Sequence, residues 1–536
     1  MSKGIRILRS LLLGGVFCSA GVAAQNQTGW SDYSYVKQSE AWLSSYNAGG
    51  LRRLPIDKIS VAELYAHKQN GEFVNYYQSD NSYNLGARVE SFYRLTSRVV
   101  FYGLVNYDYF KGKHMGGSAF IDPCSNPFDI VEYTDDCRGE KEKETYHLIG
   151  AVSGDLLDDL TVGGKIDYTA ANYAKFKDLR HQNKLLDMFV TAGLTYRINT
   201  SVEAGANYYY RRSTEGVEFD TYGTTGREYI SLIDYGGFYG ITEGDGNGYT
   251  KLNDEKPMFN EYNGGSLQLS FRITPQLSFF NEFTYQSRNG YYGKRSPSSI
   301  VYSEHEGATL EYAGTLSLNE QNNRHQLLVR LSREELENNQ TNYRLETGSV
   351  GNSVIVYYDP VKVGDKQFFN AGVEYKGYLG IVDFNPRWAL NGKAEYSNRR
   401  LTASVYPYYR KQTVHYTNYE AHATRNFPRG KNMYAISLGA SFLSGGDRPK
   451  DDGVYATPTE SQTFPRNSDL YLYREYEYLT NGRFTGEATF KYSRIFDDVN
   501  MKGYASIGYK LTKASDVVYL PGDKHHQFRL TIGCTF

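Results

Sequence analysis

Two cysteines in one hydrophilic stretch are the residues with the clearest chemistry. Cys124 and Cys137 stand thirteen positions apart in a segment rich in charged and polar residues. In an exported protein such a pair favours a disulfide that closes a loop. Metal binding is the weaker interpretation, since neither cysteine belongs to a C-x-x-C motif or has a histidine at ligand spacing. We therefore predict a disulfide between Cys124 and Cys137.

The ten histidines do not form a recognisable catalytic or metal-binding pattern. His525 and His526 are adjacent, so on a strand they would point to opposite faces and could not easily share a metal. Some outer-membrane β-barrels are phospholipases or proteases. Such an enzyme would need a nucleophile with a positioned base, or a paired Asp and His at the outer rim of the barrel. We expect no catalytic residue, no cofactor and no metal site, and an enzyme ranks third among the functions considered.

Charged residues recur at alternate positions of stretches whose other positions are apolar. Lys or Arg facing lipid at the membrane midplane would cost roughly 2–4 kcal/mol, so these charges are expected to face the inside of a barrel. A salt-bridged, packed interior and a water-filled pore with little ion preference both stay open. The candidate lumen-facing charges are Arg88, Glu90, Lys165, Asp167, Glu203, Glu282, Glu374, Arg483, Glu487, Lys491 and Arg529.

The alternation is clearest at the last residues of the sequence. Phe528, Leu530, Ile532 and Phe536 are separated by small or polar residues, so a strand here would have one apolar and one polar face. This pattern resembles the terminal strand that the outer-membrane barrel assembly machinery reads. We predict that these four residues form such an assembly signal.

Short corners and long connections alternate along the chain. The corners recur at 94–99, 155–160, 197–202, 272–277 and 494–499, and the long, charged, glycine-rich connections lie at about 110–144, 212–264, 287–306, 334–366 and 444–480. Short periplasmic turns on one rim and long outer loops on the other are typical of an outer-membrane barrel. A soluble meander or propeller would have connections of similar length on both sides. We expect an even strand number of 14 to 18, with an ambiguous register between about 360 and 445.

The start of the chain has the pattern of a secretory signal peptide over residues 1–24. Basic residues precede an apolar stretch at 11–20, and small residues stand before Gln25. A lipoprotein signal at Cys18 is disfavoured by Phe17. Residues 25–70 do not alternate and are expected to form a periplasmic or luminal segment, with a plug as one form of it. Residues 71–536 are expected to form the transmembrane barrel.

Composition supports this fold class and excludes others. The mean hydropathy of −0.58 and the absence of a long apolar run exclude a helical membrane protein, while 51 Tyr and 53 Gly suit a barrel with aromatic girdles. The formal net charge of −1 argues against nucleic acid as a ligand. The predicted fold is an all-β, antiparallel transmembrane barrel; a soluble, secreted all-β protein is the competing interpretation.

Several short motifs resemble uncharacterised outer-membrane β-barrel proteins of Bacteroidota. They are Asn47-Ala48-Gly49-Gly50-Leu51, Gly71-Glu72-Phe73, Phe101-Tyr102-Gly103 with Tyr107, Asp122-Pro123 and the Phe-ended last strand. The resemblance implies the outer membrane of a Gram-negative bacterium and a barrel fold. It implies no activity, substrate or catalytic residue.

The expected function is that of a channel or uptake barrel for a small hydrophilic or amphipathic solute. The alternative is a non-conducting surface-binding or scaffold barrel, whose outer loops engage a partner protein or a glycan. The expected partners are outer-membrane lipid, the barrel assembly machinery during biogenesis, and a solute or surface partner of unknown identity.

Overall fold

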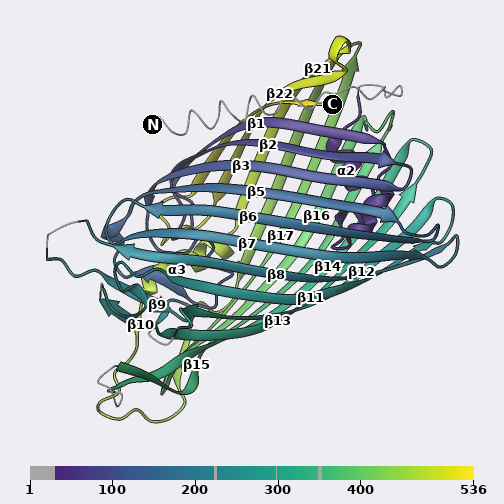
Figure 1. The fold of residues 1–536 in the computed structure, drawn as a ribbon. Helices are drawn as coiled ribbons and strands as arrows, with labels where there is room; N and C mark the ends of the chain where they lie inside the picture. The colour runs from purple at the N-terminus through teal and green to yellow at the C-terminus, as the bar shows by residue number, and fades with distance from the viewer. Residues whose placement is uncertain (1–29, 223–225, 245, 297–298, 348–352) are drawn as a thin grey trace.

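The chain folds into a β-barrel. The computed structural model describes residues 30–222, 226–244, 246–296, 299–347 and 353–536, so the predicted signal peptide lies outside the described residues. The wall runs through the chain in order (Figure 1). Its strands are β1 (Lys58–Asn70), β2 (Asn81–Thr96), β3 (Val99–Met115), β5 (Gly139–Asp155), β6 (Leu160–Lys175), β7 (Arg180–Arg197), β8 (Val202–Asp220), β11 (Lys256–Arg272), β12 (Leu277–Gly293), β13 (Val301–Asn319), β14 (Asn323–Thr347), β15 (Ser353–Leu379), β16 (Trp388–Val405), β17 (Tyr408–Arg429), β18 (Asn432–Gly446), β21 (Arg483–Phe496), β22 (Met501–Ala514) and β23 (Lys524–Thr535).

Antiparallel pairing between the first and last strands closes the wall. Residues 61–70 of β1 pair with residues 526–535 of β23. The large sheet has 19 strands. One of them, the short β19 (Asp451–Val454), pairs only with the outer end of β17, beyond the part of β17 that pairs with β18. Eighteen strands therefore form the closed barrel, which confirms the predicted fold class and an even count within the expected range.

Side chains alternate between the two faces of the wall. On β23 the outward Phe528, Leu530 and Ile532 are 52%, 48% and 58% exposed, and large apolar residues are exposed in the same way on the other wall strands. Their neighbours Gln527 and Arg529 occupy the opposite, luminal face. An outer apolar surface with a polar interior is the pattern of a membrane barrel.

The two ends of the barrel differ in their connections. At one end, here called the short-turn end, the strands are joined at 97–98, 156–159, 198–201, 273–276, 320–322, 380–387, 430–431 and 497–500, the last containing η5 (Asp497–Val499). All five predicted corners lie there. At the opposite long-loop end, segments 116–138, 221–255 and 447–482 are the longest.

Two parts of the predicted layout are wrong. Residues 334–347 and 353–366 are strand and not loop, because they belong to β14 and β15, whose register pairs Tyr343 with Tyr357. The barrel begins at Lys58 and not at residue 71, since 58–70 form β1. This strand was not predicted because its buried and exposed residues do not alternate throughout. Three consecutive residues, Ile59, Ser60 and Val61, are buried.

The residues before β1 fold into the lumen at the short-turn end. They form α2 (Tyr33–Ser39), η1 (Ala41–Ser44) and η2 (Ala48–Arg53), here called the plug together with the residues that link them, 30–57. Figure 1 shows α2 inside one end of the barrel and far from the helix α3 (Asp469–Thr480). Periplasmic and luminal positions were both expected for residues 25–70, and the part before β1 that the structure describes, residues 30–57, lies in the lumen.

Long loops fold inward at the opposite end and form a second obstruction, here called the cap. A small sheet has the strand order β20-β10-β9-β4, and α3 packs beside it. Aromatic rings fill the space between this sheet and the wall, with Phe128 of the cap 5.3 Å from both Tyr249 and Tyr292. The cap elements are β4 (Asp129–Glu132), η3 (Asp135–Cys137), β9 (Ile230–Asp234), β10 (Tyr239–Gly244), η4 (Gly248–Thr250), β20 (Arg466–Asn467) and α3 (Asp469–Thr480).

Neither helix of the described chain, α2 or α3, has the length and apolar character needed to cross a membrane.

Candidate functional site

The plug rests on a patch of the wall that lacks side chains. Gly163 of β6, Gly193 of β7 and Gly205 of β8 face the plug, and a Cβ on Gly163 would lie only 2.5 Å from the backbone of Ala48. We call these three residues the glycine seat. It lets the backbone of η2 approach the wall more closely than any other residue type would allow.

Asn47 fixes the plug on this seat. Its Nδ2 donates to the carbonyl oxygens of Leu194 (2.8 Å) and Ala206 (3.3 Å) and to Oε1 of Gln268 (2.9 Å). Its Oδ1 accepts from the backbone N–H of Gly49 at 3.0 Å and so caps η2. The Asn47-Ala48-Gly49-Gly50-Leu51 motif is therefore the docking segment of the plug.

Ion pairs connect the rest of the plug to strands around the barrel. Lys37 pairs with Glu90 at 2.6 Å, Arg52 with Asp155 at 2.6 Å, Arg53 with Glu203, and Glu40 with Arg324 at 3.1 Å. Tyr46 donates its backbone N–H to Glu282 at 3.1 Å. The plug thus crosses the lumen and contacts both halves of the wall.

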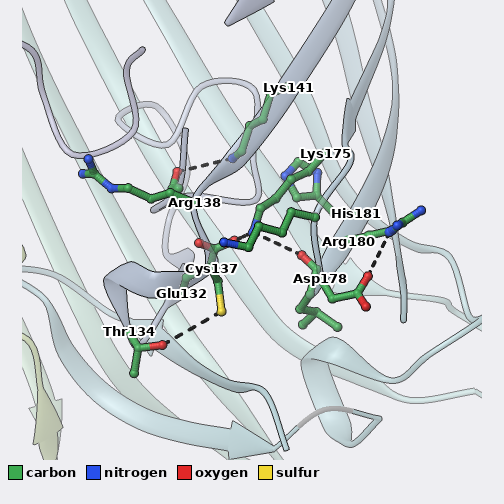
Figure 2. Close-up of polar contacts among 12 residues, drawn as sticks. Glu132, Thr134, Cys137, Arg138, Lys141, Lys175, Asp178, Arg180 and His181 are labelled. Atoms are coloured by element: carbon green, nitrogen blue, oxygen red, sulfur yellow. Dashed lines mark hydrogen bonds and ion pairs between the residues drawn. The ribbon is translucent and has the colours of Figure 1, made fainter. Parts of the chain in front are cut away.

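Buried Lys and Arg side chains of the wall hold the cap through hydrogen bonds and ion pairs. Lys141 donates to the carbonyl oxygen of Ser118 at 2.7 Å and Lys366 to that of Asn126 at 2.8 Å. Lys175 of β6 pairs with Glu132 of β4, as Figure 2 shows. On the other side of the mouth, Arg399 forms a two-pronged pair with Glu475 of α3, at 3.0 and 2.6 Å.

The structure does not form the predicted disulfide between Cys124 and Cys137, because both thiols are free. Cys124 is exposed before β4, whereas Cys137 is buried in η3 after it, so the two thiols lie in different surroundings. Cys137 Sγ instead lies 4.0 Å from Oγ1 of Thr134 (Figure 2). It also lies 3.5 Å from Nη2 of Arg227.

A cavity of about 460 Å³ lies between the cap and the wall. The loop between β1 and β2 contributes Phe73 and Tyr77, and the end of α3 contributes Tyr478. The cap core packs mainly against β8, β11, β12, β13, β15 and β16, whereas the cavity is bounded by β1–β3, β5, β6, β17, β18 and β21–β23. The cavity is therefore the part of the outer lumen that the cap leaves unfilled, and we call it the side cavity.

A second cavity of about 260 Å³ lies above the plug. Tyr46 of the plug borders it together with Lys165, Asp167, Asp187 and Arg211 of the wall. Arg211 and Asp187 form a bidentate pair at 2.9 and 2.6 Å. Most of the charge around this cavity is thus matched by opposite charge.

The predicted lumen-facing charges fall into different environments, as follows. Arg88 and Glu90 pair with each other, Glu203 with Arg53 and Glu487 with His422; Asp167 contacts His147, Glu374 lies near Arg330 and Lys376, and Glu282 binds the plug. Lys165 lies over Phe189 and Lys491 over Tyr504, while Arg529 donates to Gln527. Arg483 lines the side cavity.

Sequence reasoning missed several other residues of the side cavity. Lys143 lies in a segment assigned to a long loop, and Phe73 and Tyr478 lie outside the alternating stretches. The glycine seat carried a readable signal, since glycines at luminal positions of three consecutive strands leave room for another segment. In the described ranges, no group of three or more His, Cys, Asp or Glu residues is placed to hold a metal ion.

A family model matches residues 48–536, from the docking segment of the plug to the last strand. The chain belongs to the family of unknown function DUF6850. The bacterial group suggested by the motifs stays a prediction. No curated protein matches the sequence.

The chain is weakly similar to several solved structures. The ferric preacinetobactin receptor BauA of Acinetobacter baumannii is 10% identical, with 89% of this chain and 80% of that chain covered and a TM-score of 0.41. The toluene transporter TodX of Pseudomonas putida is 10% identical, with 91% and 92% covered and a TM-score of 0.28. Likeness at this level says nothing about the ligand of the present chain.

Proposed function

We propose that the chain is an outer-membrane uptake barrel for a small hydrophilic or amphipathic solute. The long loops face outward and the short turns face the periplasm, as in bacterial barrels generally. The solute enters the side cavity beside the cap. It leaves through the short-turn end when the plug is displaced.

The observation that carries this proposal is the plug. In a permanently open pore, a segment that crosses the lumen and is anchored to both halves of the wall would obstruct the passage. A purely structural barrel has no use for a polar cavity kept open beside its cap. A closed lumen with a preserved cavity supports regulated passage.

The contacts of the plug allow it to leave without breaking the barrel. In its described part, residues 30–57, the plug adds no strand to the wall. It is held by side-chain hydrogen bonds and ion pairs, by an apolar cluster and aromatic contacts, and by two backbone hydrogen bonds, from Asp32 to Phe384 and from Arg94 to Asp57. Lys37 is 40% exposed but its partner Glu90 is fully buried, and Glu90 keeps Arg88 as a partner when Lys37 moves away. The wall itself is closed by β1 and β23, which lie outside the plug.

Swelling of proteoliposomes in isotonic arabinose or glycine tests the proposal. The full chain is compared with a variant that lacks residues 30–53 and keeps β1. We expect slow swelling with the full chain and fast swelling with the variant. Fast swelling of both would indicate an open pore, and slow swelling of both would favour the alternative in which the outer loops are the working part; either result would contradict regulated uptake.

A further inference from the structure

The side cavity has an excess of positive charge. Lys143 of β5, Arg483 of β21 and Lys510 of β22 all line it, and Glu420 is the carboxylate among its lining residues. In the described chain, none of the three cations has a carboxylate within ion-pair distance. Glu420 accepts a hydrogen bond from Asn418 at 2.6 Å. The unmatched cations distinguish this cavity from the one above the plug.

Arg483 is held in place by aromatic rings. Its guanidinium carbon lies 5.5 Å from the ring centroid of Phe73 and 5.2 Å from that of Tyr478, and these two rings stack at 5.4 Å. Its Nη1 donates to the carbonyl oxygen of Tyr478. A guanidinium has five N–H donors, so most of them are available to an incoming anion. Stacking fixes the group before a ligand arrives, which lowers the entropy lost on binding.

The cavity also offers an apolar surface next to these charges. Phe110, Met115 and Leu443 line it together with Phe73 and Tyr173. Its volume of about 460 Å³ falls within the range of roughly 300–1,000 Å³ that is common for small-molecule sites. The site therefore combines cationic groups with a surface for a ring or a short apolar chain.

We propose that the side cavity binds a small carboxylate with an aromatic or apolar body. The carboxylate lies against Arg483, Lys143 and Lys510, and the body packs on the aromatic side chains. This inference rests on the proposed function for its biological meaning, since it names the class of solute that the uptake barrel would take. The binding itself is an equilibrium property and needs no transport.

Three molecules of nearly identical shape test the proposal on the full chain in lipid nanodiscs. Benzoate, benzamide and benzamidine carry charges of −1, 0 and +1, and their dissociation constants are measured by ligand-observed NMR against empty nanodiscs. We expect benzoate to bind about tenfold more tightly than benzamide, and benzamidine to bind most weakly. Equal binding of all three, or no binding of benzoate, would overturn the proposal.

Matched variants locate the binding. Lys510→Gln and Arg483→Gln should each weaken benzoate binding by about tenfold. Lys513→Gln makes the same change on the same strand at an exposed position outside the cavity lining, and should leave binding unchanged. A heat-modifiable band in unboiled gels verifies that each variant folds, and Lys510→Gln remains decisive if Arg483→Gln does not fold. Equal losses in Lys510→Gln and Lys513→Gln would contradict the assignment.

The two proposals fail in different ways. Benzoate binding without solute flux in the plug-deleted variant would refute uptake and keep the anion site. Flux without a preference for benzoate would refute the anion site and keep uptake.

Discussion

Individual side chains close the lumen by joining segments that are far apart in the sequence. Asn47 binds the backbone of β7 and β8, and Arg399 binds Glu475 of α3. The inward charges that these contacts use cannot face lipid, and most of them have opposite charges or hydrogen-bond acceptors nearby. At this scale the interior is packed and salt-bridged, and the side cavity differs because its Lys and Arg side chains have no carboxylate within ion-pair distance in the described chain.

The cap should become less stable as the pH rises through the weakly acidic range. Burial raises the pKa of Asp129 in β4 from 3.8 to about 6, although Ser118 and Tyr76 donate hydrogen bonds to it. The folded cap therefore binds this proton more strongly than the unfolded loop does. The stabilisation is present below about pH 4 and is lost as the pH rises past 6.

Asp129→Asn should reduce this dependence, by an amount of the order of 2 kcal/mol. Resistance of the cap to a protease added on the long-loop side, measured at about pH 5 and about pH 8 on either side of the titration, reports the effect. The wild-type chain should be cleaved faster at the higher pH, and the variant should show a smaller difference. Some dependence will remain because burial also raises the pKa of Asp234. Identical pH profiles for both proteins would show that Asp129 is not responsible.

Among the elements, the plug depends on close approach to the glycine seat. Gly163→Ala would place a methyl group against the backbone of Ala48 and Gly49, whereas a methyl group on the adjacent Gly164 would lie 3.8 Å from its nearest neighbour, the carbonyl oxygen of Thr191. Overpacking of this kind typically costs about 1–3 kcal/mol. Gly163→Ala should therefore loosen the plug while Gly164→Ala should not.

Amide hydrogen exchange of residues 41–53, read by mass spectrometry, measures this difference. We expect exchange about tenfold faster in Gly163→Ala than in the wild-type chain, and unchanged exchange in Gly164→Ala. Equal protection in both variants would mean that the plug does not depend on the seat.

The wall elements could be predicted from the sequence and a plug was one expectation for the segment before them, but the contacts of the plug and the whole of the cap could not be predicted. A strand with one lipid face and one luminal face leaves a two-residue period in its own sequence, as 528–536 show, and tight corners mark its ends. β1 escaped because its buried residues interrupt that period. The cap and the side cavity depend on contacts such as that of Arg399 with Glu475, which no local pattern encodes. Local patterns also did not show the pairing with β9 of β4, the strand that lies between the two free cysteines.

At the scale of the whole molecule, the plug closes the short-turn end, whereas the cap occupies only one side of the long-loop end (Figure 1). The side cavity lies between the cap and the wall. β1 and β23 close the wall without a strand from the plug. We therefore predict that passage through the lumen is controlled by the plug alone.

Single-channel conductance in planar lipid bilayers tests this central claim most directly. The full chain and the variant lacking residues 30–53 are inserted from the same detergent, and heat-modifiable migration verifies that both are folded barrels. We expect no steady conductance for the full chain and steady conductance for the variant. Steady conductance of the full chain, or its absence in the folded variant, would contradict control by the plug.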